Sequence, residues 1–437
     1  MTILLVGLAL LPIAVAALIA GMRAPIRVLL ASYALVLPFG SAVSVPLGLP
    51  APFDTPSSLM GLVVMAGLVM HLILVPRSAP VLMPAVPAWL LFAAVAAFSV
   101  AWSIDPSATM NETIILLSLL ALYVLVCLMP VEERDLRRVE EALVLGGAIA
   151  GAYGIALLVS TGLENVGGTS PRFATAGGVG KGIDPNITAA TLILPLAIAV
   201  GRAVQARTAL ARLAFWTASG LIGAAIVLTG SRGGLLAALV VLTIHVASHQ
   251  SRRRIAFVGL GLVLVAGLTL SLAPGQLRHR ITRPGSSGRT DIWRTAMTQC
   301  DRYCLSGAGF GTFPEVYQDA LHSETTARGM DRPFVAHSIW IGALIETGFA
   351  GALLLIVALA LVGMDLMRLP RESRASPLAG FAGVLVASTF LSTLGFKYFW
   401  MVLMYAGLAT LVHERRRVPK ALGLRYAPMP LITVGDA

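Results

Sequence analysis

The stretch Leu228–Ala237, "LTGSRGGLLA", decides the class of fold, because it joins two apolar runs that are each long enough to cross a bilayer. The first run covers residues 211–229 and the second covers 232–248. Arg232 stands between them, with no acidic residue near it in the sequence. Two such runs joined by a short polar turn indicate a pair of membrane helices that meet at the lipid boundary.

The composition extends this interpretation to the whole chain. Of the 437 residues, 57% are hydrophobic and only 12% are charged, which is more apolar surface than a soluble domain can bury. We therefore predict one polytopic, all-α membrane domain over 1–437, without an N-terminal signal peptide. Thirteen apolar runs predict thirteen transmembrane helices, or twelve if the second run, interrupted by Pro38, is re-entrant. The runs lie at 3–21, 25–40, 57–75, 84–101, 112–129, 139–160, 186–203, 211–229, 232–248, 255–273, 337–362, 377–394 and 396–413.

The distribution of basic residues predicts the orientation. Short loops of one set hold 20 of the 32 lysines and arginines, so these loops should be cytoplasmic, where anionic headgroups offset much of the net charge of +11. The first outer loops, near 41–56 and 103–111, hold none. Later outer segments hold the other 12, which breaks the bias in one region: Arg172, Lys181, Arg232, Arg278, Arg280, Arg283, Arg289, Arg294, Arg302, Arg328, Arg332 and Lys397.

Two outer loops are long enough to carry a site. The first, 161–185, is rich in glycine and ends in "DPN", which predicts Asp184 or Asn186 as the cap of the next helix. The second, 274–336, contains an amphipathic stretch that we expect to form a surface helix, capped by Ser287 or Thr290. The following "LSGAGFGTF" is a turn where the backbone can pass close to a ligand. Cys300 and Cys304 could form a disulfide only if the local backbone departs from a regular helix.

Three arginines in three outer segments are candidates for an anion site. Arg232 follows Ser231 at a helix start, where the helix dipole disfavours a cation but open amides favour a phosphate. Arg289 precedes the expected surface helix, and Arg172 lies in the first long loop. For any one of them, contact with headgroups or solvent is the ordinary role. Three together indicate a site that binds an anion such as phosphate, because guanidinium matches phosphate geometry.

His337 is the candidate general base, since it precedes the long crossing 337–362 at the outer face. His322 competes with it for this role. Glu346 is the one obvious carboxylate within a crossing, and a structural ion pair is its ordinary role. The sequence has no D-x-D, Walker, HExxH or G-x-S-x-G motif and no histidines at ligand spacing, so we expect no metal and no cofactor.

The motifs "RF…DPN", "TGSRGG", "GRTDIWRTA", "GAGFGTF" and "AHSIW…ETGFAG" follow one another between residues 172 and 351. In this order they resemble the bacterial O-antigen ligase and polymerase family, over about residues 165–410. The resemblance implies a GT-C-like membrane glycosyltransferase in the bacterial inner membrane. It further implies a metal-independent, inverting transfer, on the periplasmic side, of a glycan from undecaprenyl pyrophosphate to a hydroxyl of lipid A–core. The family's His-Asn pair reads His337-Ser338 here.

The resemblance assigns roles residue by residue. Arg232 and Arg289 would hold the donor pyrophosphate, Arg172 would support it, and His337 would deprotonate the acceptor. The other predicted substrate-binding residues are Lys181, Asn186, Ser231, Trp293, His322 and Glu346. A repeat-unit polymerase, with a second lipid-linked glycan as acceptor, is the first alternative, and a protein-glycosylating ligase is less favoured. A flippase of lipid-linked sugars is the alternative from another class, but it should carry basic residues within the crossings. Nothing in the sequence indicates nucleic acid as a partner.

Overall fold

The structure is a computed structural model that describes residues 21, 24–39, 55–75, 83–161, 172–178, 182–248, 252–282, 288–323 and 334–422. The predicted crossing 3–21 lies almost wholly outside these residues, as do Lys181 and Ser287. The elements in chain order are η1 Ile26–Leu30, α2 Ala31–Val36, η2 Leu37–Phe39, α3 Pro56–Leu74, α4 Ala85–Phe98, η3 Ser99–Trp102, α5 Pro106–Cys127, α6 Glu133–Thr161, β1 Gly177–Gly178, β2 Gly182–Ile183, α7 Pro185–Gln205, α8 Ala209–Leu228, α9 Arg232–Ser248, α10 Arg252–Leu272, α11 Gly275–Thr282, α12 Arg289–Met297, α13 Cys300–Tyr303, α14 Phe313–Ser323, α15 Ile339–Arg368, α16 Arg371–Ser388 and α17 Lys397–Leu422.

Seven helices in the described part of the chain are long and apolar enough to cross a membrane. They are α3, the continuous helix Ala85–Trp102, α5, α6, α7, α8 and α15. Two shorter apolar helices, Ile26–Phe39 and α9, coincide with predicted crossings. The remaining predicted runs from 255 onward fall on α10, α16 and α17. The all-α integral membrane fold is thus confirmed, while the count of twelve or thirteen crossings stays a prediction.

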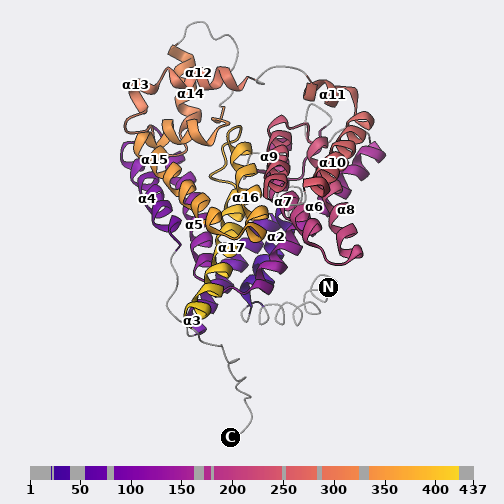
Figure 1. Cartoon of the computed structure of the whole chain (residues 1–437). Coiled ribbons are helices and arrows are strands. Elements are labelled where there is room, and N and C mark those ends of the chain that lie inside the picture. The colour runs from indigo at the N-terminus through magenta and orange to yellow at the C-terminus, as the bar shows by residue number, and fades with distance from the viewer. Residues whose placement is uncertain are drawn as a thin grey trace, which may run out of the picture.

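Helix α7 forms the centre of the bundle, with α6, α8, α9 and α16 packed around it (Figure 1). Almost its whole length is buried in protein and not exposed to lipid. Its first turn is set by the "DPN" sequence. The Asp184 side chain accepts a hydrogen bond of 2.7 Å from the Asn186 amide, and Pro185 occupies the first helical position. Asp184 is therefore the cap, one of the two residues predicted for it.

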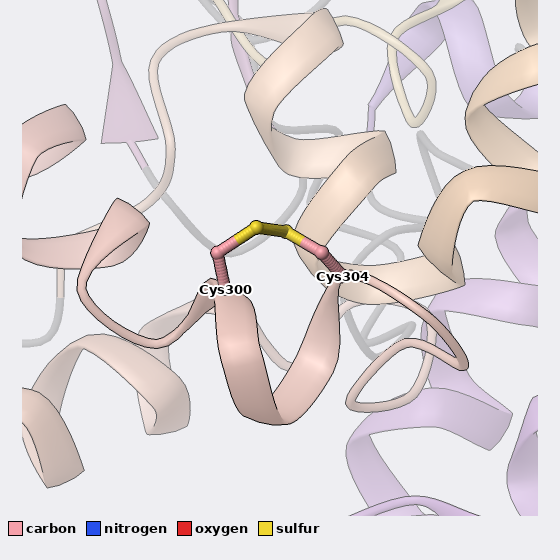
Figure 2. Close-up of a disulfide and its surroundings, with 2 residues drawn as sticks. All are labelled: Cys300 and Cys304. Carbon is pink, nitrogen blue, oxygen red and sulfur yellow. A yellow bond between two sulfur atoms is a disulfide. The ribbon is translucent and has the colours of Figure 1, made fainter.

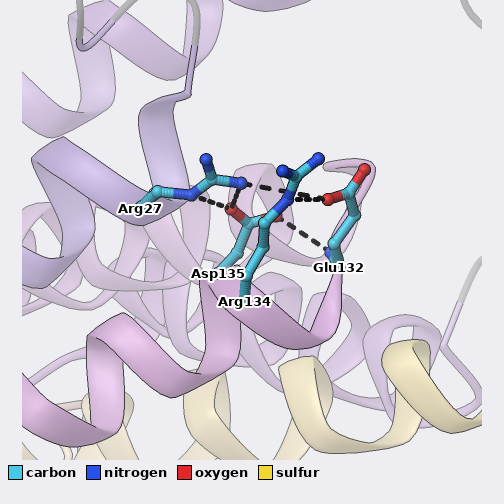
Figure 3. A network of polar contacts seen from close by, with 4 residues as sticks. All are labelled: Arg27, Glu132, Arg134 and Asp135. Atoms are coloured by element: carbon cyan, nitrogen blue, oxygen red, sulfur yellow. Dashed lines mark hydrogen bonds and ion pairs between the residues drawn. The ribbon is translucent and has the colours of Figure 1, made fainter.

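At the end of the bundle that we predict to be cytoplasmic, arginines and carboxylates pair (Figure 3). The Arg27 guanidinium bonds to Asp135 at 2.7 and 2.8 Å, and Arg134 pairs with Glu132. The other Asp135 oxygen accepts a hydrogen bond of 2.9 Å from the Glu132 amide. These contacts join η1 to the start of α6, so the basic residues there have partners within the protein.

Helices α12 to α14 lie together at the opposite end of the bundle, and α11 lies apart from them at the same end, next to α10 (Figure 1). The predicted surface helix is α12, and it buries Ile292 and Ala296 as its apolar face requires. The predicted cap is wrong, however. Gly288 occupies the N-cap position with φ 80°, and as a glycine it has no side chain to bond to the helix amides. This left-handed conformation favours glycine, so the helix start is set by backbone geometry.

Cys300 and Cys304 form a disulfide across the four-residue helix α13 (Figure 2). Beyond it, the glycine turn packs against α15, which has a non-helical residue at Gly348 with φ 68°. The Phe349 amide donates to the Cys304 carbonyl at 2.8 Å, and the Gly309 amide donates to the Glu346 carbonyl at 3.0 Å. A Cβ on Gly307 would lie 2.4 Å from that Glu346 oxygen. The turn is therefore glycine-rich because it approaches a helix, and the expected ligand contact is not what requires these glycines.

Candidate active site

Arg172 is the most buried member of the predicted arginine set, with 8% of its surface exposed. It lies just before β1, and its Nε donates to the Thr229 carbonyl at 2.7 Å. Its Nη2 donates to Asn186 Oδ1 at 3.1 Å. The neighbouring Phe173 amide donates to the Leu228 carbonyl at 3.0 Å. These bonds hold the first long outer loop against the end of α8 and the start of α7.

Arg232 is the first residue of α9, as the "TGSRGG" turn predicts. Gly230 supplies the turn with φ 61°, and Ser231 Oγ accepts a hydrogen bond of 3.2 Å from the Gly234 amide. Ser231 thus caps the helix, and Arg232 stands where the helix dipole is positive. A bound anion would offset both charges at this position.

Arg289 opens α12 and lies over the ring of Phe390, 5.8 Å from the ring centroid to the guanidinium carbon. Phe390 follows α16, and a Cβ on Gly233 would lie 3.2 Å from its Cδ2. The phenyl ring therefore lies between the start of α9 and Arg289. This contact brings the surface helix to the turn that carries Arg232, although 57 residues separate the two arginines in the sequence.

Arg280 in α11 joins the cluster, which the sequence interpretation did not foresee. A Cβ on Gly230 would lie 3.7 Å from Arg280 Cδ and 3.6 Å from Arg172 Nε, so both side chains reach the same turn. The basic motif "RHR" and the break in the positive-inside bias marked the region, but not this residue.

The arginines of the cluster lie close enough together for their charges to lower the pKa values of Arg172 and Arg289. Burial, and then the charges of Arg280 and Arg289, lower the pKa of Arg172 to about 10, while the charge of Asp184 opposes them. The pKa of Arg289 is lowered by burial and by the charges of Arg232 and Arg280, again against Asp184. Both Arg172 and Arg289 remain charged at neutral pH. The cluster therefore concentrates positive charge around a single carboxylate.

His337 precedes α15 and is the one non-glycine residue with positive φ, at 46°, in the described part of the chain. Burial, and then the charge of Arg289, lower its pKa, while Asp184 raises it. The ring is therefore neutral at pH 7, as a general base must be. Its backbone conformation is uncommon outside glycine and is typical of residues held in place for a function.

Trp293 and Ser338 hold His337 on either side. Trp293 Nε1 donates to the Ala336 carbonyl at 2.8 Å and so ties α12 to the residue before the histidine. Ser338 caps α15, its hydroxyl accepting from the Ile341 amide at 3.5 Å. The substrate-binding role of Trp293 stays a prediction, and this bond also allows its indole to position the segment before the histidine. Ser338 therefore serves as the helix cap.

Of the other predicted site residues, some belong to the arginine cluster and some lie outside it. Asn186 and Ser231 belong to the arginine cluster through the contacts already described. Glu346 lines a cavity together with Glu112, and this cavity is distinct from the arginine cluster in its lining residues. The backbone of His322 lies near the end of α14, and its side chain lies outside the described residues. Among the described residues, no group of three His, Cys, Asp or Glu side chains is placed to hold a metal ion.

Comparison with known families identifies the segment that carries most of this geometry. Residues 217–356 match the family model of the O-antigen ligase domain, Wzy_C. The match includes Arg232, Arg280, Arg289 and His337, while Arg172, Asp184 and Phe390 lie outside it. It supports the assignment to the O-antigen ligase and polymerase family that the motifs predicted. A search of curated proteins finds no match.

Proposed function

We propose that this protein is an O-antigen ligase-type glycosyltransferase. It transfers a glycan from undecaprenyl pyrophosphate to an acceptor hydroxyl on the periplasmic face of the inner membrane. The observation that carries the proposal is the arginine cluster. Arg172 and Arg280 both reach the Gly230 turn that leads to Arg232. Arg289 lies over Phe390, which packs against the start of α9, and its charge acts on His337. The O-antigen ligase domain supplies three of these arginines and the histidine.

The chemistry of the donor explains why this arrangement suits the reaction. A lipid pyrophosphate leaves with more negative charge than it had as an ester, so cations fixed at its position stabilise the transition state. Guanidinium groups offer paired donors that match phosphate oxygens. The Arg289 ring contact and the Arg172 hydrogen bonds pre-position two of these groups before substrate arrives. Attack from the side opposite the departing phosphate inverts the sugar carbon.

His337 takes the proton of the acceptor hydroxyl in this mechanism. Its lowered pKa keeps the ring unprotonated at neutral pH, and the nearby Arg289 charge becomes less unfavourable once the pyrophosphate binds. The bond from Trp293 to Ala336 fixes the chain just before the histidine. Arg172 lies in a loop, Arg232 and Arg289 begin helices, and Arg280 lies in the last turn of the short helix α11. These positions favour an enzyme with its site at the membrane face over a flippase with a basic transport path.

A deletion strain and a reconstituted assay test the proposal together. Without the protein, the host should accumulate lipid-linked glycan and lose its long-chain surface polysaccharide. The purified protein in lipid nanodiscs should transfer that accumulated glycan to core lipopolysaccharide from the same strain, without added metal. Surface glycans capped with a single repeat would assign the polymerase reaction instead. Failure of the native protein to consume the lipid-linked donor would overturn the proposal.

A further inference from the structure

Leu305 leaves 79% of its surface exposed in the turn that follows the disulfide, between α13 and α14. Its neighbour Cys304 is buried, as is Gly307 two residues further on. A single exposed leucine is ordinary on a protein surface, so the position of the turn relative to the membrane helices decides what covers this side chain.

Helix α15 gives one measure of that position. Its 30 residues extend over about 45 Å, whereas the hydrocarbon core of a bilayer is about 30 Å thick. The non-helical residue Gly348 divides the helix, and the lower part, 349–368, has a length of about 30 Å. With Arg368 at the end that we predict to be cytoplasmic, Phe349 lies at the outer boundary of the hydrocarbon. The turns 339–347 then rise above this boundary.

The continuous helix of α4 and η3 gives a second measure, because its 18 residues extend over about 27 Å. It ends at Trp102, and tryptophan is typical of the boundary between hydrocarbon and headgroups. The turn bonds to both boundary residues. Trp102 Nε1 donates to the Ser306 carbonyl at 3.1 Å. The Phe349 amide donates to the Cys304 carbonyl at 2.8 Å. Leu305 stands between these two acceptors in the chain, so it lies at the outer boundary as well.

The exposed side chains around Leu305 continue the lipid-facing surface of the bundle. Phe98 and Trp102 lie one turn apart, with 71% and 47% of their surface exposed. Phe349 and Leu353 lie one turn apart on α15, with 58% and 61% exposed. Helices α4 and α15 pack against each other, and α13 lies at their outer end (Figure 1). Leu305 therefore extends the apolar surface of this helix pair beyond the helices themselves.

We propose that the turn 304–309 inserts into the outer leaflet of the membrane and buries Leu305 among the upper acyl chains. The transfer of a leucine side chain from water to hydrocarbon is favourable, and the indole of Trp102 suits the same depth. Irregular backbone is tolerated near lipid only where its polar groups are bonded within the protein. Three amides of the turn meet this condition. Those of Gly307, Ala308 and Gly309 donate to the carbonyls of Tyr303, Ile345 and Glu346 at 2.7, 2.9 and 3.0 Å.

The insertion also affects the candidate active site. Cys304 shares a small apolar core with Ile292 of α12 and with Ala336, the residue before His337. The turn, α12 and the histidine segment are thus packed as one unit, whose core is separate from the main core of the bundle. Because this unit rests in the leaflet through Leu305, His337 is held at a constant distance from the surface of the membrane.

Fluorescence quenching in nanodiscs tests the insertion. Leu305→Trp adds an indole at the proposed depth, and Arg294→Trp adds one at an exposed position of α12 as the matched control. In phosphatidylcholine brominated near the top of its acyl chains, the emission added at 305 should be largely lost, and that added at 294 should be kept. Acrylamide, which stays in the water, should quench the emission at 294 more strongly than that at 305. Trp102→Phe should remove part of the bromolipid quenching of the native protein.

Emission at 305 that the brominated lipid leaves intact would overturn the proposal. Strong quenching by acrylamide would then mean that Leu305 faces water, and quenching by neither reagent would mean that protein, such as a second copy of the chain, covers it.

Hydrogen exchange tests whether the leaflet holds the turn. Leu305→Asp should raise the exchange rates of amides 307–309 in nanodiscs by about tenfold or more, because the burial of one leucine no longer opposes opening of the turn. Leu305→Met is the matched control, since it keeps an apolar side chain and should exchange at the native rate. The amides of the central helix α7 should exchange at native rates in both variants, which shows that the bundle is intact. Native rates at 307–309 in Leu305→Asp would also overturn the proposal.

Discussion

Arg172 Nε donates a 2.7 Å hydrogen bond to the carbonyl of Thr229, and so joins the first outer loop to the turn that carries Arg232. Its Nη2 bonds to Asn186 at the same time. The guanidinium makes these two bonds from two different nitrogens and still has N–H donors to direct to a substrate. Arg172 thus links the segment before β1, the end of α8 and the start of α7 into one wall of the site.

The two bonds of Arg172 predict that lysine cannot replace it. Arg172→Lys should reduce glycan transfer by about tenfold or more, because one ammonium cannot hold both partners and contact a phosphate. Initial rates in nanodiscs measure the effect, and a thermal unfolding scan reports any loss of packing. Arg294→Lys is the control, since Arg294 is exposed and pairs with Asp291 on its own helix. Equal rates for Arg172→Lys and the native protein would remove Arg172 from the site.

Arg232 was predicted from the sequence and Arg280 joins the cluster only in the structure, and the loss of either arginine should reduce glycan transfer. Arg232→Ala should lower turnover by about a hundredfold or more, the effect of losing one electrostatic stabiliser of the transition state. Arg280→Ala should also reduce transfer, although α11 is more exposed and screening weakens its charge. Rates measured at low and high salt separate these roles, because the exposed arginine should lose more of its effect in salt. Native turnover in Arg232→Ala would contradict the phosphate-binding role.

Much of this site follows from local patterns in the sequence. The Asp184 cap, the helix start at Arg232 and the amphipathic α12 each depend on a few neighbouring residues, and all three were predicted. What could not be predicted depends on contacts between distant segments. Arg280 joins through the close approach of α11 to Gly230, and Phe390 joins by packing against both Gly233 and Arg289. The glycines of the 305–311 turn were assigned to a ligand because their partners lie in other segments of the chain, Glu346 of α15 for Gly307 and residues 103–112 for Gly309 and Gly311.

The pKa of His337 predicts the pH dependence of transfer. The acid limb of the rate should have its midpoint below the ordinary histidine value of about 6.5, because burial and then Arg289 disfavour the charged ring. Activity is therefore lost as the pH falls through the lowered pKa and is constant above it. Arg289→Gln removes a positive charge that opposes protonation, so the acid limb should move to higher pH even though the rate is lower. A pH–rate profile of each protein measures this. An acid limb that stays in place, or moves to lower pH, would contradict the role of His337 as the base.

The disulfide predicts a stability effect that is separate from chemistry. Cys300 and Cys304 close a very short loop, so the bond should contribute about 2 kcal/mol to the free energy of unfolding in the chain-entropy account. Cys304→Ser should therefore lower the unfolding temperature in nanodiscs, and a reducing agent should lower that of the native protein but not that of the variant.

The Trp293 bond predicts a kinetic effect that a loss of stability cannot imitate. Trp293→Phe keeps an aromatic ring against the buried face of α12 but removes the donor to the Ala336 carbonyl. The segment before His337 then loses its anchor, so the positive φ of the histidine is less firmly held. We expect kcat to fall by about tenfold with the donor KM unchanged, because the pyrophosphate contacts remain. Trp340→Phe serves as the control, since Trp340 bonds to Thr389 on α16 and not to the histidine segment. A Trp293→Phe variant that raises the donor KM and keeps kcat would place the indole in donor binding, as the sequence alone had predicted.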